Sequence, residues 1–439
     1  MSFANSKILS KKVRNFEEVQ LSSDGTKGIA GSYSDEGIFY TNDSGANWLQ
    51  SNITNGYFVV TLSSDGITGF SGSVKTAITD SNYYTNNSGE TWIQCNITTD
   101  NLRNSALSAD GTKGIASSSQ GNGLFYTSNS CATWTQSNLT TDNFEGFVLS
   151  SDGTKGITGT LFDGGIYYTN NSGVTWTQSN MTTGFFTSFA LSSDGTIGIA
   201  SNSGSDKGIY YTNDSGVTWT LSNITSSSFK LSLSSDGTKG IAGSGLLDSN
   251  GIYYTNNSGE TWTQSNITSD NFDVSLSSDG TKGIAGSFPS RVGIYYTSNS
   301  GETWTQSNIT DKSFSTISLS SDGTKSIASS ISDTVNGIYY TNNSGATWKK
   351  GNFENNNIQE KIEEQIKAIL LKKGITDYSI QFCDGKRKLI LRIKGSCNKC
   401  ICISYENFTD NQILADNPKW LKCLNCKITC GIAGCSKKK

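Results

Sequence analysis

Tryptophan recurs along this chain at an almost constant spacing, and this spacing constrains the fold more than any other feature. Consecutive members of one series lie 42 to 44 residues apart, and each closes a near-copy of the same phrase. A period of this length is typical of repeat architectures, whose small units stack because none can bury its apolar face alone. The series comprises Trp48, Trp92, Trp134, Trp176, Trp219, Trp262, Trp304 and Trp348.

The composition predicts a turn-rich β protein. The 439 residues include 47 glycines and only two prolines, and Trp, Tyr and Phe return at fixed positions, unlike in a disordered chain. No apolar run approaches the roughly 18 residues of a membrane span, and the first residues lack the apolar core of a secretory signal. Of the ten cysteines, only Cys95 and Cys131 lie in the repeats. We therefore expect an intracellular, cytoplasmic protein, whose recurrent N-x-T sequences are a by-product of repetition and not glycosylation sites.

Charge divides the chain into two parts. Residues 1–352 carry 18 basic and 28 acidic residues, which gives −10, whereas residues 353–439 carry 16 and 9, which gives +7. The predicted organisation is a short lead (1–12), the repeats (13–352), an amphipathic helix (353–375) and a cysteine-rich module (376–439).

One unit, residues 272–308, reads as four short strands. FDVSLSSDG alternates apolar and polar residues and ends in Asp-Gly, a strong hairpin signal. KGIAGS, GIYYT and ETWTQSN follow, separated by a variable loop and by a Ser-Asn-Ser-Gly turn. Four strands in about 43 residues make one meander, and radial repetition of such meanders produces a β-propeller.

Two further markers give the same number of units as the tryptophans. We therefore predict an all-β, eight-bladed β-propeller within residues 13–352, followed by a small α+β module. The turn aspartates are Asp24, Asp65, Asp110, Asp152, Asp194, Asp236, Asp279 and Asp322. The first-strand leucines are Leu21, Leu62, Leu107, Leu149, Leu191, Leu233, Leu276 and Leu319.

The turn before each tryptophan reads T-N-[D/N]-S-G-x-T-W, as in residues 212–219. It resembles the Asp-box, or BNR repeat, of the propellers of sialidases, sortilin-type receptors, xyloglucan-degrading glycosidases and photosystem II assembly factor-like proteins. The resemblance implies a structural box, in which an Asp or Asn oxygen accepts N–H bonds and the indole wedges between blades. Only Asp43 and Asp214 keep the acid, which argues against calcium. Cys131 replaces the glycine in the third unit, so we expect that turn to be strained.

Successive turns of a meander lie on opposite faces, and the units differ on one face only. The SSDGTK turn and the Asp-box turn share one face and vary little, whereas the second-to-third loops differ in every unit. Scaffolded variable loops commonly carry recognition, so we place the ligand there; the alternative is that these loops are merely unconstrained. The candidate residues are Tyr33, Asp35, Glu36, Lys75, Asp80, Phe162, Asp163, Asp206, Leu247, Asp248, Phe288, Arg291 and Asp333.

The other face carries a ring of lysines that could contact a polyanion. Each follows a turn aspartate by three residues, so we interpret them as part of solvated turns. They are Lys27, Lys113, Lys155, Lys239, Lys282 and Lys325.

Histidine is absent, which excludes His-based triads and His-ligated metal sites. A sialidase needs three arginines around a carboxylate, but Arg14, Arg103 and Arg291 occupy three different phases of the repeat. A glycoside hydrolase needs only two carboxylates at a set separation, so the acidic residues of the variable loops keep that alternative open.

The C-terminal part has a different sequence pattern from the repeats, with a predicted helix, two strands and paired cysteines. Asn357 and Glu360 form a capping-box-like start, apolar residues then follow at helical spacing, and Gly374 closes the helix. Strands at YSIQFC and KRKLILRIKG follow. Two C-x-x-C pairs then predict a structural zinc site of four thiolates, as in zinc ribbons, with disulfides as the alternative. The predicted ligands are Cys397, Cys400, Cys423 and Cys426, while Cys402, Cys430 and Cys435 are left over.

The sequence thus favours a non-catalytic scaffold that docks a protein or a glycan on the variable face. The alternative is an Asp/Glu-dependent glycoside hydrolase. The zinc-bound module would add a second contact. Its +7 charge would fall to roughly +5 with four thiolates and one zinc ion, which leaves nucleic acid as a weaker partner class.

Overall fold

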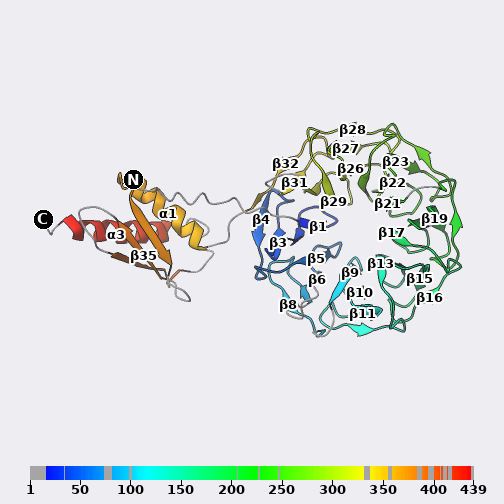
Figure 1. The fold of residues 1–439 in the computed structure, drawn as a ribbon, viewed down its shortest axis with the longest axis horizontal. Coiled ribbons are helices and arrows are strands. Elements are labelled where there is room, and N and C mark those ends of the chain that lie inside the picture. Colours follow the sequence, from blue (N-terminus) through cyan, green and yellow to red (C-terminus); the bar gives the residue numbers. More distant parts are fainter. Residues whose placement is uncertain are drawn as a thin grey trace, which may run out of the picture. The chain divides into compact units, whose positions relative to one another are not determined.

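The structure is a computed structural model with two compact units, residues 1–353 and 354–439. It describes residues 16–33, 35–73, 82–97, 101–204, 206–225, 228–245, 248–330, 337–353, 358–382, 388–393, 400–405, 407–408, 413 and 418–436. In the first unit, eight antiparallel sheets stand around a central axis, so the predicted eight-bladed propeller is confirmed (Figure 1).

Each blade is a meander whose four strands are paired in chain order. The first strand of each blade lies nearest the centre and the fourth at the rim (Figure 1). The first strands are β1 (Phe16–Leu21), β5 (Phe58–Leu62), β9 (Leu102–Leu107), β13 (Phe144–Leu149), β17 (Phe186–Leu191), β21 (Phe229–Leu233), β25 (Phe272–Leu276) and β29 (Phe314–Leu319). The second strands are β2 (Gly28–Ser32), β6 (Gly69–Ser73), β10 (Gly114–Ser118), β14 (Gly156–Thr160), β18 (Gly198–Asn202), β22 (Gly240–Ser244), β26 (Gly283–Ser287) and β30 (Ser326–Ser330).

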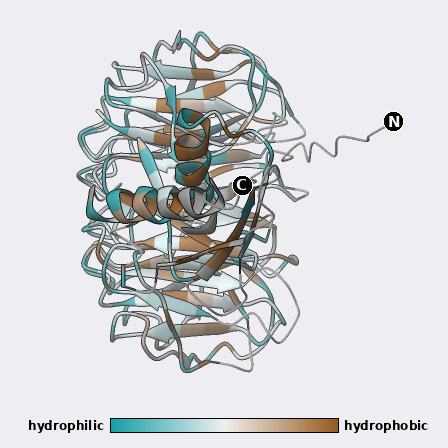
Figure 2. Ribbon diagram, turned by 90° about the vertical axis from the view of Figure 1, so that its left-hand side faces the viewer, coloured by the Kyte–Doolittle hydropathy of each residue, from teal (hydrophilic) through white to brown (hydrophobic). Residues whose placement is uncertain are grey.

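The outer half of each blade is shorter. The third strands are β3 (Ile38–Thr41), β7 (Tyr83–Thr85), β11 (Leu124–Thr127), β15 (Ile166–Thr169), β19 (Gly208–Thr212), β23 (Ile252–Thr255), β27 (Ile294–Thr297) and β31 (Gly337–Thr341). The fourth strands are β4 (Asn47–Gln50), β8 (Ile93–Gln94), β12 (Thr135–Gln136), β16 (Thr177–Gln178), β20 (Thr220–Leu221), β24 (Thr263–Gln264), β28 (Thr305–Gln306) and β32 (Lys349–Lys350). In Figure 2 brown, apolar segments lie on strands of the blades and on the helices of the second unit, whereas many of the turns are teal.

The apolar core lies between blades, where each repeat tryptophan is buried. Trp92 of the second blade packs in one cluster with Ile29 and Ile38 of the first blade and with Phe58 of its own. The eight indoles are between 0% and 4% exposed. Replacing such a tryptophan by alanine costs about 3–5 kcal/mol, so these side chains hold neighbouring blades together.

The last strand of the first unit, β33, pairs with the first blade and so closes the ring. β33 (Asn352–Phe353) pairs in parallel with β4, with Asn352 opposite Asn47 and Phe353 opposite Trp48. The Phe353 ring stacks on Phe16, with centroids 5.1 Å apart, and on Trp48 at 6.0 Å. The chain therefore adds a fifth strand to the outer edge of blade 1 immediately before the second unit begins.

The described part of the second unit contains a three-stranded antiparallel sheet and the helices α1 and α3. The order is α1 (Ile358–Lys372), β34 (Tyr378–Phe382), β35 (Lys388–Ile393), β36 (Cys400–Ser404) and α3 (Pro418–Ser436). Ile362 and Ile366 of α1, Leu391 of β35, and Trp420 and Leu424 of α3 share one buried core, so both helices contact the same face of the sheet. None of the helices within the described segments is long and apolar enough to cross a membrane.

The structure ends α1 where the sequence predicted, and it contains a second long helix, α3, that the sequence analysis did not predict. Gly374 has a φ of +70°, and the N–H of Ile375 donates to the carbonyl of Leu370 at 3.0 Å, which is a Schellman-type stop. Cys423 and Cys426, two of the predicted zinc ligands, lie within α3, a helix that the sequence analysis did not predict. The physical reason is the apolar spacing of Trp420, Leu424 and Ile428, which buries one stripe of this helix in the core.

Candidate functional site

Hydrogen bonds define two faces of the propeller. In each blade the third-to-fourth turn donates to the first-to-second turn, as from the N–H of Ser44 to the carbonyl of Thr26 at 2.9 Å. We call this side the turn face. The second-to-third loop bonds instead to the loop that enters its own blade, as from the N–H of Ser203 to the carbonyl of Phe185 at 2.9 Å. We call this side the loop face. The predicted division of turns and loops between two faces is thus confirmed.

The turn face is used for holding the ring together. A circle of backbone hydrogen bonds joins the first-to-second turns of successive blades, beginning at Ser23 N–H to Ser64 carbonyl and closing at Ser321 N–H to Ser23 carbonyl, both 2.8 Å. Within one turn, the Asp24 carboxylate accepts from the Ser22 hydroxyl at 2.6 Å and the Thr26 N–H at 2.9 Å. These bonds, that from Ser22 first, lower the pKa of Asp24 to about 2.

The ring of lysines also joins blades, a role that the sequence interpretation missed. Four of the six ammonium groups donate to the backbone carbonyl of the aspartate in the next turn, and Lys325 contacts Asp24 in this way at 2.9 Å. The other described pairs are Lys113 with Asp152, Lys239 with Asp279, and Lys282 with Asp322. Because these ammonium groups are occupied by neighbouring turns, a polyanion site on this face has little support.

The loop face holds every described candidate residue. Lys75, Asp80, Leu247 and Asp333 lie outside the described residues. The others lie on second-to-third loops of five blades and differ widely in exposure. Phe162 is 69% exposed, and Glu36 is only 4% exposed. Asp35, Asp163, Asp206 and Arg291 are exposed, and Tyr33, Asp248 and Phe288 are half-buried.

Two of the acidic candidates hold neighbouring loops together. Asp35 Oδ1 accepts the Gly56 N–H at 2.8 Å, and Asp163 Oδ1 accepts the Gly184 N–H at 2.6 Å. Each bond joins a second-to-third loop to the loop that leaves the same blade. Both aspartates have a positive φ, 60° and 37°, a conformation that aspartate tolerates better than most residues. Their carboxylates therefore serve loop structure.

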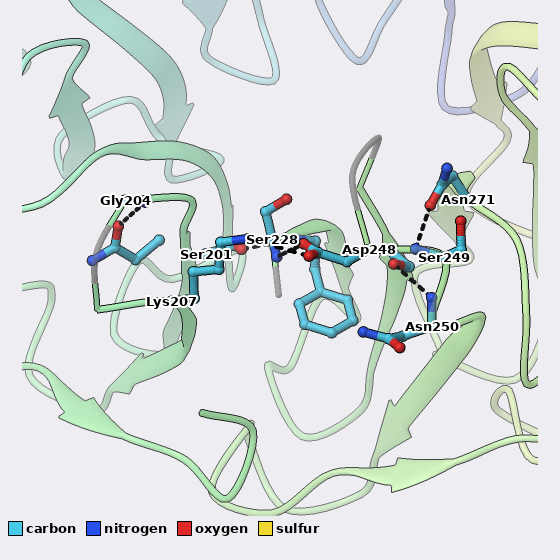
Figure 3. Close-up of polar contacts among 11 residues, drawn as sticks. Ser201, Gly204, Lys207, Ser228, Asp248, Ser249, Asn250 and Asn271 are labelled. Atoms are coloured by element: carbon cyan, nitrogen blue, oxygen red, sulfur yellow. Dashed lines mark hydrogen bonds and ion pairs between the residues drawn. The ribbon is translucent and has the colours of Figure 1, made fainter. Parts of the chain in front are cut away.

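Asp248 is the centre of a polar network that crosses blades 5 to 7 (Figure 3). Its carboxylate lies 3.1 Å from the ammonium of Lys207 in blade 5 and accepts the Ser228 N–H at 3.0 Å. The adjacent Ser249 N–H donates to the Asn271 side chain at 3.0 Å, on the loop entering blade 7. Asp248 and Lys207 are 17% and 34% exposed. Lys207, Ser228 and Asn271 were not predicted, because nothing in the repeat pattern pairs residues of different loops.

Part of the inner edge of the propeller is occupied by hydrogen bonds between blades. In five blades a first-strand N–H donates to a side chain of the preceding blade, as in Val60 N–H to Glu18 Oε2 at 3.3 Å and Ile317 N–H to Asp273 Oδ2 at 2.9 Å. Burial raises the pKa of Asp273 to about 6, opposed by nearby Lys230. A partner that adds a strand along the channel would have to displace these contacts.

Three of the four predicted zinc ligands lie among the described residues. Cys397 lies outside the described residues, and Cys400 begins β36. Cys423 is half-buried and Cys426 exposed, on successive turns of α3. Among the residues that the structure describes, no three His, Cys, Asp or Glu side chains come together as a metal site would require. The four-thiolate site therefore stays a prediction.

Comparison with known proteins supports the fold alone. No protein-family model matches the chain, and no curated protein matches it. Among solved structures, the Dos1 propeller is 13% identical with a TM-score of 0.54, over 79% of this chain and 96% of that one. YCF48 from Cyanidioschyzon merolae is 16% identical, with a TM-score of 0.46, over 65% and 94%. An ancestral GH74 enzyme is 10% identical, also with a TM-score of 0.46, over 92% and 69%.

Proposed function

We propose that this protein is a non-catalytic scaffold that docks a polypeptide on its loop face. The observation that carries this proposal is the Asp248 network, which holds loops of three successive blades to one another. Loops fixed in this way lose little conformational freedom on binding, and such preorganisation favours affinity.

The exposed residues of the same face suit a polypeptide. Phe162 leaves 69% of its surface in water, and burying a Phe side chain contributes about 1.5–3 kcal/mol. The exposed Asp206 and Arg291 add charges of opposite sign. An exposed aromatic residue and charges of both signs on one face are typical of protein-recognition surfaces.

A displayed library of random peptides, selected on the immobilised full-length protein, tests this proposal. We expect enriched peptides to bind Phe162→Ser about tenfold more weakly, the effect of roughly 1.4 kcal/mol. Val174→Ser is the matched control, because Val174 is 41% exposed on the turn face. Peptides that bind Phe162→Ser unchanged, or a protein that enriches only glycans from an array, would overturn the assignment.

The glycoside hydrolase alternative has less support. General acid–base hydrolysis needs two carboxylates free to exchange protons at a set separation. Asp35, Asp163 and Asp248 instead accept hydrogen bonds from backbone amides. The expected result is no turnover on a panel of plant and bacterial polysaccharides. If the protein hydrolyses a polysaccharide and the Asp206→Asn change abolishes this activity, the glycoside hydrolase function replaces the scaffold function.

For the second unit we propose a structural zinc ion held by Cys397, Cys400, Cys423 and Cys426. The support is chemical: Cys423 and Cys426 are three residues apart on a helix, so both thiols point to the same side. Metal analysis of purified protein should give about one equivalent of zinc, and less than half an equivalent would reject the site.

Nucleic acid is a second possible partner class for this unit. Salt-dependent binding of RNA or DNA to the full chain, lost when Lys419 and Lys422 are neutralised, would add nucleic acid as a partner.

A further inference from the structure

One sector of the loop face combines an exposed aromatic ring with unbalanced negative charge. It lies on three neighbouring blades, the third to the fifth (Figure 1). Its loops, which we call the acidic sector, are residues 119–123, 137–143, 161–165, 179–185 and 203–207. They contain three aspartates, Asp142, Asp163 and Asp206, and one basic residue, Lys207. Because the Lys207 ammonium is paired with Asp248 of blade 6 at 3.1 Å, no cation of these loops remains to balance the three carboxylates.

Phe162 and Asp142 lie close to each other in the acidic sector. The Leu161 N–H donates to the Asn143 carbonyl at 2.9 Å, so the residue after Leu161 and the residue before Asn143 flank one hydrogen bond. Burial and, to a smaller extent, the nearby Asp142 carboxylate raise the pKa of Tyr167 on β15. Phe162 is 69% exposed, and Asp142 is exposed as well. A partner can therefore reach the ring and this carboxylate at one place.

The other two aspartates continue the acidic sector toward blade 5. Asp163 directly follows Phe162, and its Oδ1 accepts the Gly184 N–H at 2.6 Å, so its Oδ2 remains for a partner. Asp206 lies on the second-to-third loop of the next blade, where its backbone carbonyl accepts the Tyr210 hydroxyl at 3.3 Å. Both aspartates are exposed. Three carboxylates thus accompany one exposed ring on adjoining loops.

We propose that the acidic sector binds a basic, arginine-bearing segment of the docked polypeptide, which rests on the docking function proposed above. A guanidinium group stacks on aromatic rings and pairs with carboxylates, and Phe162 lies next to Asp142 and Asp163 as such a contact requires. Asp206 attracts a further basic side chain of the segment, because unbalanced charge on a surface steers ions of the opposite sign toward it.

The loops across the ring do not offer the same combination. Blades 7 and 8 lie on the opposite side of the propeller from the acidic sector (Figure 1). Their loops carry Arg291 and Lys312 together with Asp270 and Asp311, so acidic and basic residues alternate there. Phe288 of the same loops is half-buried. Since charges more than about 8 Å apart are largely screened at physiological ionic strength, we expect a basic segment to prefer the acidic sector.

Peptides enriched from the displayed library on the full-length protein are the probe for this proposal. We expect them to contain more arginine and lysine than the unselected library. The best peptide should bind about tenfold more weakly when citrulline replaces its arginines, because citrulline keeps the shape of the side chain and removes the charge. Binding should also weaken as the salt concentration rises.

Variants of the protein locate the contact. Asp142→Asn, Asp163→Asn and Asp206→Asn together remove three charges, while the amide at position 163 keeps an oxygen that can accept the Gly184 N–H. The best peptide should bind this triple variant about tenfold more weakly. Phe162→Leu keeps an apolar side chain but removes the ring, and it should bind the peptide about threefold more weakly.

A matched control removes three charges from the other side of the same face. It combines Asp35→Asn, Asp270→Asn and Asp311→Asn. Asp35 accepts a glycine N–H as Asp163 does, and Asp270 and Asp142 both have a positive φ, 73° and 78°. This control should weaken binding of the peptide by less than about threefold.

The outcomes distinguish the acidic sector from the docking function. Enriched peptides with no excess of arginine and lysine, or equal weakening by both triple variants, would overturn the acidic sector and leave docking on the loop face in place. A library that yields no binding peptide would overturn the docking function and the acidic sector with it. If the triple variant fails to fold, the citrulline peptide and Phe162→Leu still decide, because unchanged binding in both would overturn the proposal.

Discussion

The side chain of Asn308 pairs with the backbone of Trp348 in both directions. Its Nδ2 donates to the Trp348 carbonyl at 3.1 Å, and its Oδ1 accepts the Trp348 N–H at 2.7 Å. One amide side chain thus takes the place of a neighbouring strand and joins the seventh blade to the eighth. The same arrangement repeats for Asn52 with Trp92, Asn138 with Trp176, Asn180 with Trp219, Asn223 with Trp262, and Asn266 with Trp304.

Removing this amide should destabilise the propeller. Asn308→Ala leaves two backbone groups of Trp348 without their partner, and each lost bond of this kind costs about 1 kcal/mol. We expect the free energy of unfolding in urea to fall by about 2 kcal/mol. Asn170→Ala, at an exposed position of a turn, is the control and should change stability by less than about 0.5 kcal/mol. Equal losses in both variants would contradict the pairing role.

Ring closure should depend on Phe353. Its ring packs on Phe16 and Trp48, so Phe353→Ala should cost roughly 2 kcal/mol and expose the first blade selectively. Hydrogen exchange followed by mass spectrometry checks this prediction, with faster exchange expected in β1 and β4. Faster exchange spread evenly over all eight blades would mean that the parallel strand is not the closure.

Much of this architecture could be predicted from local sequence, because each repeat contains the same turn-forming residues. The Asp-Gly turns and the Gly374 end of α1 depend on contacts within a few residues, and the tryptophan period gives the number of blades. The Asn308-type pairing was missed, although Asn recurs at one fixed place in the units, because its partner lies in the next repeat. The strand β36 and the helix α3 were missed because their cysteines were interpreted as metal ligands, while the helical spacing of Trp420, Leu424 and Ile428 went unused.

The loop network shows why the candidate site was harder to predict than the fold. Asp248 was singled out from sequence as a ligand-binding residue, but the structure joins it to Lys207 and Ser228, which belong to other loops. These loops differ from unit to unit, so periodicity carries no information about which residues meet. Only the closed ring brings them together.

Acid should destabilise the turn face. The pKa of Asp152 is lowered to about 2, chiefly by the Ser150 hydroxyl and the Thr154 N–H, against about 3.9 in an unfolded chain. A carboxyl with a lowered folded-state pKa stabilises the fold above pH 4, and this contribution is lost as the pH falls from about 4 to about 2. Urea midpoints measured across this range should drop less steeply for Asp152→Asn. An Asp206→Asn control should keep the wild-type slope.

Asp273 should have the opposite dependence on pH. Burial raises its pKa to about 6, above the unfolded value of about 3.9, although nearby Lys230 partly opposes the shift. The folded state therefore binds more protons than the unfolded state between these two values, and stability decreases as the pH rises from about 4 to about 6. Asp273→Asn keeps an oxygen that can accept the Ile317 N–H, now at 2.9 Å, but removes the buried charge. The variant should unfold at higher urea than the wild type at pH 7 and at the same urea at pH 3.5. A variant that is less stable at pH 7 would show that the Lys230 attraction outweighs the cost of burial.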